Sequence, residues 1–271
     1  MTRTSAAVVA LALLLAFPGA ARGENDPEGP APLQGVEIVE KLNGAVPQGA
    51  AFLDQDGKPV RLGDVLGQGK PVVLALVYYE CPMLCGLVLG GMARGMKETG
   101  LELGKDYTAL SISFDPREKP AQAFVRQKHY LQSFDKADRK DVWPFWVGQE
   151  KDIRAVTDAV GFHYTFDEET KQYAHGAAIL VLTPDGRVSR YLYGVEFPGR
   201  DLRLALVEAA DGKVGTSFDR FLLTCYRYDP VARRYVPYAM GMVRAGALLV
   251  LFGLATTLFV FWRREAKGAR R

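Results

Sequence analysis

Two cysteines separated by three residues are the side chains of this sequence best suited to chemistry. They lie in the stretch Cys81-Pro82-Met83-Leu84-Cys85, after the apolar run Val72 to Tyr79. Pro82 suits the first position of a helix, so the sequence predicts Cys81 near the N-cap and Cys85 one turn later on the same face. The positive end of such a helix favours thiolate over thiol. The pair is therefore expected to be a redox pair, a metal clamp or a structural disulfide.

His175 is the histidine expected to join this pair. The chain has three histidines, and His175 is the one that directly precedes a predicted buried strand and is flanked by the small residues Ala174 and Gly176. Two thiolates and one imidazole form a set of ligands that suits copper or zinc. A structural zinc site normally has four ligands, whereas three ligands and an open position suit copper, as Cu(I) or Cu(II), that is handed on. No CxxCH motif occurs, which argues against covalently attached haem.

The elements that must position these residues are strands alternating with helices. Apolar or alternating runs predict strands, and amphipathic runs predict helices. A hairpin is expected to turn at Asp56-Gly57. The sequence predicts strands at 72–79, 107–114, 142–147, 177–182 and 188–193, and helices at 87–98, 121–134, 151–160 and 201–210. This order predicts an α/β fold, a thioredoxin-like mixed sheet flanked by helices, with the cysteines at the carboxyl edge of a strand and the segment entering the 177–182 strand against their helix.

The two ends of the sequence predict targeting and anchoring. Residues 1–23 have the charged start, apolar centre and small-residue end of a signal peptide, and residues 24–45 are expected to be a linker. The domain is expected at 46–211 and an appended segment at 212–243. An uncharged run within 244–262 is long enough for a transmembrane helix, and the basic tail 263–271 predicts a cytoplasmic C-terminus. We therefore expect a protein of the bacterial inner membrane whose domain lies on the periplasmic side.

Three motifs in this order resemble the Sco/SenC family. They are the cysteine stretch after Tyr78-Tyr79, Ser111-Ile112-Ser113-Phe114-Asp115-Pro116, and Tyr173-Ala174-His175 followed by Val181-Leu182-Thr183-Pro184-Asp185-Gly186. The family consists of thioredoxin-fold copper proteins for cytochrome c oxidase assembly. The resemblance implies that Cys81, Cys85 and His175 bind one copper. It also implies delivery of copper to the dinuclear copper centre of oxidase subunit II, or reduction of its cysteines.

Three further residues are accessory candidates. Met83 could contact the metal or simply pack, and Asp115 could orient the site or cap the next helix. Cys225 is a third cysteine, expected to be a buried thiol, an extra ligand or an intermolecular partner. Once the cationic ends are set aside, the rest of the sequence is mildly acidic, so nucleic acid is not an expected partner.

The leading hypothesis is a copper chaperone rather than an enzyme. The enzyme-class alternative is an extracytoplasmic thiol–disulfide oxidoreductase that uses Cys81 as its nucleophile. The CxxxC spacing argues against it, because thioredoxin-type oxidoreductases use CxxC. A peroxidase is a third hypothesis.

Overall fold

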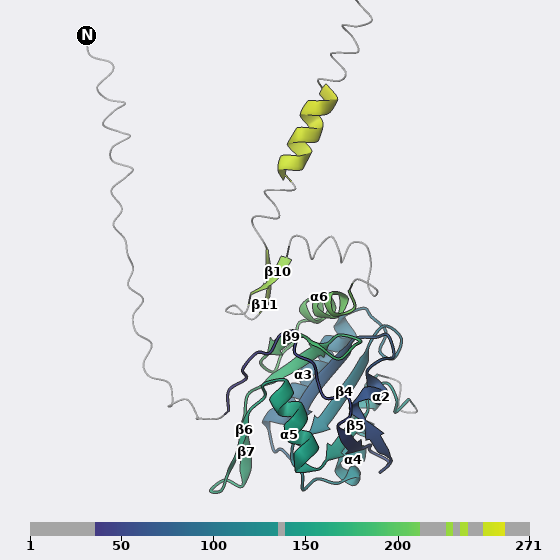
Figure 1. Cartoon of the computed structure of the whole chain (residues 1–271), viewed down its shortest axis with the longest axis vertical. Helices are drawn as coiled ribbons and strands as arrows, with labels where there is room; N and C mark the ends of the chain where they lie inside the picture. The colour runs from purple at the N-terminus through teal and green to yellow at the C-terminus, as the bar shows by residue number, and fades with distance from the viewer. Residues whose placement is uncertain (1–35, 135–138, 212–225, 230–233, 238–245, 258–271) are drawn as a thin grey trace, which may run out of the picture. The chain divides into compact units, whose positions relative to one another are not determined.

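The body of the protein is a seven-stranded mixed sheet. The computed structural model describes residues 36–134, 139–211, 226–229, 234–237 and 246–257. The strand order is β2-β1-β5-β4-β3-β8-β9 (Figure 1). These strands are β1 (Ala51–Leu53), β2 (Pro59–Arg61), β3 (Val72–Val77), β4 (Thr108–Ser113), β5 (Phe145–Gly148), β8 (Ala178–Leu182) and β9 (Val188–Tyr193). The helices are α2 (Leu62–Val65), α3 (Leu84–Glu98), α4 (Pro120–Gln132), α5 (Glu150–Ala159) and α6 (Gly199–Ala209).

The centre of the sheet is the parallel pair β3 and β4. Every residue of both strands is buried, as expected for continuous runs of apolar and small residues in a sheet covered on both faces. Val72 pairs with Thr108 and Val77 with Ser113, so the two strands end at the same edge. The Phe114 N–H then donates a hydrogen bond to the Val77 carbonyl. The loops after β3 and β4 therefore start side by side.

The antiparallel strand β8 brings a third segment to this edge. Ala75 of β3 pairs with Ile179 of β8, so β8 begins where β3 ends. The residues that precede β8 include His175. The order and direction of three strands thus place the cysteine loop, the loop after β4 and His175 at one edge.

Helices flank the sheet, and the whole is a thioredoxin-like mixed sheet, as predicted. Helix α3 packs against α6 and contacts β3 and β8. Helix α4 packs on β5, and its Tyr130 hydroxyl donates to the Gly86 carbonyl of α3. Helix α5 lies on the viewer's side of the sheet in Figure 1. The hairpin predicted at Asp56-Gly57 is confirmed as β1–β2, with Gly57 at a φ of 79°.

Two parts of the body differ from the sequence prediction. Residues 36–45, predicted as linker, are hydrogen-bonded to the domain: Ile38 bridges to Phe162 and Ala45 to Arg187. This segment joins the domain because its backbone finds partners at two strand ends. An unpredicted hairpin, β6 (Tyr164–Asp167) and β7 (Gln172–His175), also stands outside the seven-stranded sheet as a two-stranded sheet of its own.

The described part of the C-terminal region contains a two-stranded sheet and a helix. Strands β10 (Tyr226–Asp229) and β11 (Arg234–Pro237) form an antiparallel pair. Residues 246–257 are helical. Among the residues that the structure describes, no helix has the length and apolarity needed to cross a membrane. The predicted signal peptide, Cys225 and the ends of the predicted transmembrane segment lie outside the described residues.

Candidate metal centre

The cysteine loop begins with a turn directly after β3. The Cys81 N–H lies 3.4 Å from the Tyr78 carbonyl and closes this turn. Helix α3 then begins at Leu84 with Met83 as its N-cap. The prediction of Cys81 near the N-cap, with Pro82 at the first helical position, was therefore wrong. The reason is the backbone of Met83, whose φ of −144° and ψ of −73° are not helical.

Both cysteines nevertheless lie at the start of α3. Cys81 is 8% exposed and Cys85 2%, and both thiols are free. The backbone N–H of Cys85 donates to Cys81 Sγ at 3.4 Å. This N–H is one of those in the first turn of a helix that have no partner within the helix. Cys81 thus accepts a hydrogen bond from the helix terminus although it lies outside the helix.

His175 completes the group from the end of β7. Its Nε2 lies 3.4 Å from Cys85 Sγ, and its Nδ1 lies 2.9 Å from the Gly176 carbonyl. A carbonyl only accepts hydrogen bonds, so Nδ1 carries a proton. Nε2 is the ring nitrogen that faces the cysteines. A backbone partner that fixes the tautomer in this way is typical of histidines that bind metals.

Aromatic rings surround the imidazole of His175. Its ring centre lies 5.1 Å from that of Phe114, 5.8 Å from that of Phe162 and 6.2 Å from that of Tyr78. All three aromatic residues are buried. Rings packed on several sides leave the imidazole little freedom to turn, so Nε2 keeps its orientation toward the sulfurs.

The two thiols differ in acidity. A hydrogen bond from the Cys85 side chain, followed by one from His175, holds the pKa of Cys81 well below its usual value. Burial, together with the neighbouring Cys81, raises the pKa of Cys85 well above its usual value. Without a metal, Cys81 is therefore the thiolate of the pair and Cys85 the thiol that donates to it. A soft metal ion that replaces the shared proton would bind both sulfurs.

Glu118 supports the cysteine loop from the loop after β4. It is buried, and its carboxylate accepts hydrogen bonds from the N–H groups of Tyr79 and Glu80 at 2.9 and 2.7 Å. The Ser113 hydroxyl donates to it at 2.5 Å. Burial raises the pKa of Glu118, whereas these hydrogen bonds oppose that rise. The carboxylate joins the two residues before Cys81 to the end of β4.

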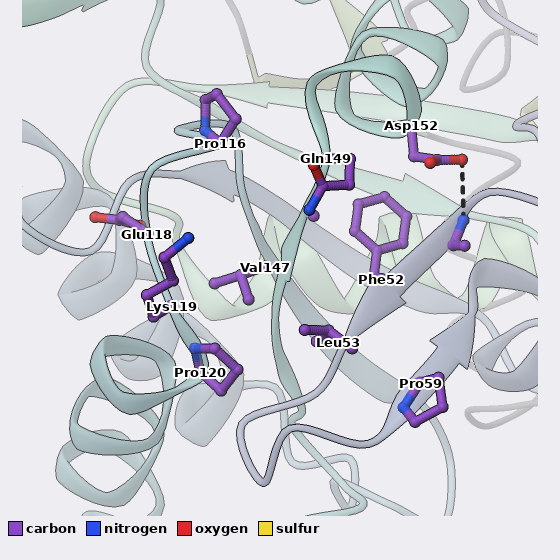
Figure 2. A pocket seen from close by; sticks show the side chains of 12 residues that line it. Phe52, Leu53, Pro59, Pro116, Glu118, Lys119, Pro120, Val147, Gln149 and Asp152 are labelled. Carbon is purple, nitrogen blue, oxygen red and sulfur yellow. Dashed lines mark hydrogen bonds between the residues drawn. The ribbon is translucent and has the colours of Figure 1, made fainter.

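A cavity of about 290 Å³ lies on the other side of Glu118. Its walls include Phe52, Leu53 and Val147, and none of the candidate ligands lines it. Figure 2 shows the Glu118 carboxylate pointing away from the Phe52 ring across the cavity. This orientation agrees with its hydrogen bonds to the cysteine loop, so Glu118 lines the cavity while its carboxylate serves the candidate centre.

Two of the three accessory candidates, Met83 and Asp115, lie in the described part of the chain. Met83 is 70% exposed at the start of α3. Asp115 is buried, and its carboxylate accepts hydrogen bonds from the Arg117 side chain and from the Tyr173 hydroxyl. Its partners therefore link it to the hairpin that carries His175. Cys225 lies outside the described residues.

Cys81, Cys85 and His175 thus come together, but not in the geometry of a finished metal site. In the described part of the chain, no group of three or more histidine, cysteine or acidic side chains has the spacing of a metal-binding cluster. The chemistry of the donors still fits copper, because two buried sulfurs and a partly buried imidazole come together.

Sequence reasoning missed Glu118 and the hairpin β6–β7. Glu118 has a weak signal, since it is an acidic residue between a Pro116 loop and the helix start at Pro120. The hairpin also had a partial signal: Tyr164 to Asp167 alternates in polarity and a polar turn follows it, but Gln172 to His175 does not alternate. Both strands are only four residues long, which is why the pattern is weak.

Two solved structures with TM-scores of 0.50 or above support the fold. A protein from Aquifex aeolicus VF5 is 24% identical, with a TM-score of 0.56 over 64% of this chain and 96% of that chain. BsSco, a member of the Sco family of cytochrome c oxidase assembly proteins in which a disulfide switch was identified, is 25% identical, with a TM-score of 0.50 over 64% and 98%. ScoI of Arabidopsis thaliana, solved with copper bound, is 20% identical, with a TM-score of 0.49 over 63% and 99%.

Comparison with sequences gives the family. A search of curated proteins returned no significant match. The SCO1/SenC family profile matches residues 45–205, which is more than half of the chain and contains Cys81, Cys85 and His175. This chain belongs to the SCO1/SenC family.

Proposed function

We propose that this protein is a copper chaperone that binds one copper ion through Cys81, Cys85 and His175. The observation that carries the proposal is the contact of Cys85 Sγ with His175 Nε2 at 3.4 Å, beside the free thiol of Cys81. Family membership supports it, and so does the match to BsSco, a member of the Sco family of cytochrome c oxidase assembly proteins.

The ligand set supports binding that is reversible. Two thiolates hold Cu(I), and the imidazole adds a ligand that also suits Cu(II). Three protein ligands leave a position open, through which a receiving ligand can enter before the donor ligands leave. Cys81, at 8% exposure, is the more accessible of the two sulfurs. Transfer would therefore begin at the Cys81 side of the site.

The proposed client is the dinuclear copper centre of cytochrome c oxidase subunit II. To test transfer, the copper-loaded protein is mixed with the metal-free soluble domain of subunit II, and copper is measured on each protein after separation. Copper is expected to move to the subunit II domain. If it stays on this protein while the client domain accepts copper from a small-molecule donor, the proposed client is wrong.

A second candidate function is reduction of a client disulfide. The difference in acidity between Cys81 and Cys85 favours it, because a thiolate attacks and a neighbouring thiol resolves. Cys81 would attack one client sulfur and release the other as a thiolate. Cys85 would then displace the client from Cys81, which leaves a Cys81–Cys85 disulfide and a client with two thiols. To test this function, the reduced, copper-free protein is mixed with an oxidised client and the free thiols on the client are counted. Two thiols per client are expected.

We also propose that the protein is anchored in the bacterial inner membrane by residues 244–262. The support is the uncharged run 245–262 within that segment, the basic residues that follow it, and the helix at residues 246–257. With a signal peptide at residues 1–23, the domain would face the periplasm. This is a compartment in which a cysteine pair can be oxidised.

A further inference from the structure

His175 lies on a strand that is not part of the seven-stranded sheet. Strands β6 and β7 pair only with each other among the described strands, so no ladder of the seven-stranded sheet fixes their position. His175 is the last residue of β7. Strand β8, which begins three residues later, ties the backbone at His175 to the sheet. The orientation of the hairpin itself depends on side-chain contacts with the rest of the domain.

Arg117 makes a two-sided contact with the hairpin. Its guanidinium lies 4.7 Å from the ring centre of Phe166 in β6 and 5.5 Å from that of Tyr173 in β7. Phe166 and Tyr173 are paired across the two strands, and their ring centres are 5.0 Å apart. A guanidinium within about 6 Å of an aromatic face is attracted to it. One arginine thus contacts both strands of the hairpin.

Asp115 fixes this arginine to the loop after β4. The guanidinium donates from Nε at 2.8 Å and from its NH2 group at 2.7 Å to the two carboxylate oxygens. The Asp115 side chain is only 7% exposed, whereas that of Arg117 is 59% exposed. Such a two-point pair fixes the plane of the guanidinium as well as its position.

Tyr173 connects this arrangement to His175. Its hydroxyl donates to Asp115 Oδ1 at 3.4 Å, and its ring meets the rings of Tyr78 and Phe114. Tyr173 and His175 are two residues apart on one strand, so their side chains lie on the same face of the hairpin. Whatever fixes Tyr173 also fixes the direction in which His175 points.

We propose that Arg117, bound to Asp115 and stacked on Phe166 and Tyr173, is a positioning residue that holds His175 against the cysteine pair. This inference rests on the proposed copper site. Cu(II) needs the imidazole, whereas Cu(I) is held mainly by the two thiolates. Arg117 therefore sets how strongly the site binds Cu(II) relative to Cu(I).

The first test uses the metal-free protein and does not depend on copper. Amide hydrogen exchange is followed for residues 164–175 in the full chain and in Arg117→Ala. Loss of the stacking contacts and of the ion pair is expected to speed exchange of this hairpin about tenfold. Arg187→Ala is the matched control, because Arg187 also pairs with an aspartate two residues earlier, Asp185, but at a turn remote from the hairpin. The control should leave exchange at 164–175 unchanged.

The second test measures copper. In Arg117→Ala, Cu(II) affinity is expected to fall about tenfold and the nitrogen hyperfine coupling from His175 to weaken, while Cu(I) affinity changes less than about threefold. Because Arg117→Ala leaves Asp115 without its cation, Phe166→Leu serves as a second variant that keeps the ion pair. Phe166→Leu is expected to speed exchange of the hairpin about threefold and to lower Cu(II) affinity about threefold.

The outcomes separate this inference from the proposed function. Unchanged exchange and an unchanged Cu(II) spectrum in both variants would overturn the role of Arg117. Faster exchange with an unchanged Cu(II) spectrum would also overturn it, since Arg117 would then hold the hairpin without positioning His175. Failure of the unaltered protein to bind copper would instead overturn the proposed function.

Discussion

At the scale of single residues, the two cysteines have opposite environments although only three residues separate them. Cys81 accepts the backbone N–H of Cys85 from the first turn of α3, whereas the Cys85 side chain in that turn is almost fully buried. The pKa of Cys81 is accordingly lowered, first by the hydrogen bond from Cys85, and the pKa of Cys85 is raised, first by burial. This difference predicts which sulfur reacts.

Alkylation of the metal-free, reduced protein tests the difference. At pH 6 a free cysteine, with a pKa of about 8.5, is almost entirely protonated. Cys81 is expected to react with iodoacetamide at a rate that hardly changes between about pH 6 and 8, whereas Cys85 stays unmodified until the protein unfolds. Peptide mass spectrometry identifies the modified cysteine. Modification of both at equal rates would contradict the assignment.

The lowered pKa of Cys81 also makes stability depend on pH. The folded state keeps a thiolate where the unfolded chain binds a proton, so this contribution is complete above about pH 8.5 and is lost as the pH falls through the folded pKa. Cys81→Ser should remove that dependence. Urea unfolding of the reduced protein between about pH 5 and 8 measures it, and an equal slope in both proteins would show that Cys81 does not ionise in the folded state.

Glu118 makes a third prediction at this scale. Glu118→Ala removes the acceptor of the Tyr79 and Glu80 N–H groups. The Tyr79 N–H is buried, and a buried donor without a partner is costly, so the free energy of unfolding is expected to fall by about 2 kcal/mol. Glu118→Gln is the control, because its amide oxygen still accepts, and it should cost less than half as much. Equal losses in the two variants would mean that the hydrogen bonds at Glu118 are not what stabilises the loop.

At the scale of elements, helix α3 holds the site by packing closely on the segment after β9. A Cβ at Gly91 would overlap the Val195 carbonyl, and one at Gly95 would overlap the Phe197 carbonyl. Small residues let a helix pack closely, and these two glycines are where α3 does so. The backbone after β9 occupies the space that side chains at these two positions would need. This close contact fixes the position of α3 and of Cys85 in its first turn.

Substitution of these glycines tests the packing. Gly91→Ala and Gly95→Ala are each expected to lower the free energy of unfolding by about 2 kcal/mol, because backbone must move. Gly90→Ala is the matched control in the same helix, where a Cβ would meet only the Arg94 side chain at 3.6 Å. It should stabilise the protein by about 0.5–1 kcal/mol through helix propensity. A loss at Gly90 as large as that at Gly91 would contradict the account.

Elements differ in how far the sequence predicts them. The central strands were predicted well, because β3 and β4 are long runs of apolar and small residues. The start of α3 was misplaced because Pro82 is compatible with a first helical turn, and only the backbone of Met83 shows that the turn begins later. Hairpin β6–β7 was missed because its strands are short and its stability comes from contacts such as those of Arg117, which are remote in sequence.

At the scale of the whole molecule, the order of the strands brings together residues that are far apart in the sequence. It brings Cys85 within 3.4 Å of His175, although 90 residues separate them. The sequence motifs indicated these residues, but Glu118 and the Arg117 contacts could not be predicted, because they depend on which loops meet at the edge of the sheet. The membrane anchor remains a prediction from sequence.

Cell fractionation tests the anchor. The full chain is expected in the membrane fraction after a carbonate wash, and a chain that stops after residue 243 in the soluble periplasmic fraction, because residues 244–262 provide the apolar length needed to span a bilayer. Recovery of the full chain in the soluble fraction would contradict anchoring, whatever the outcome for copper.

The most direct test of the central claim is copper binding by the purified, reduced protein and by Cys81→Ser, Cys85→Ser and His175→Ala. We predict one copper per chain and a sulfur-to-Cu(II) charge-transfer band for the unaltered protein. Each cysteine variant should lose the copper, and His175→Ala should lose the nitrogen signal of Cu(II). His129→Ala, a histidine of helix α4, is the control and should behave as the unaltered protein does. Equal copper affinity and equal spectra for the unaltered protein and His175→Ala would contradict the three-ligand site.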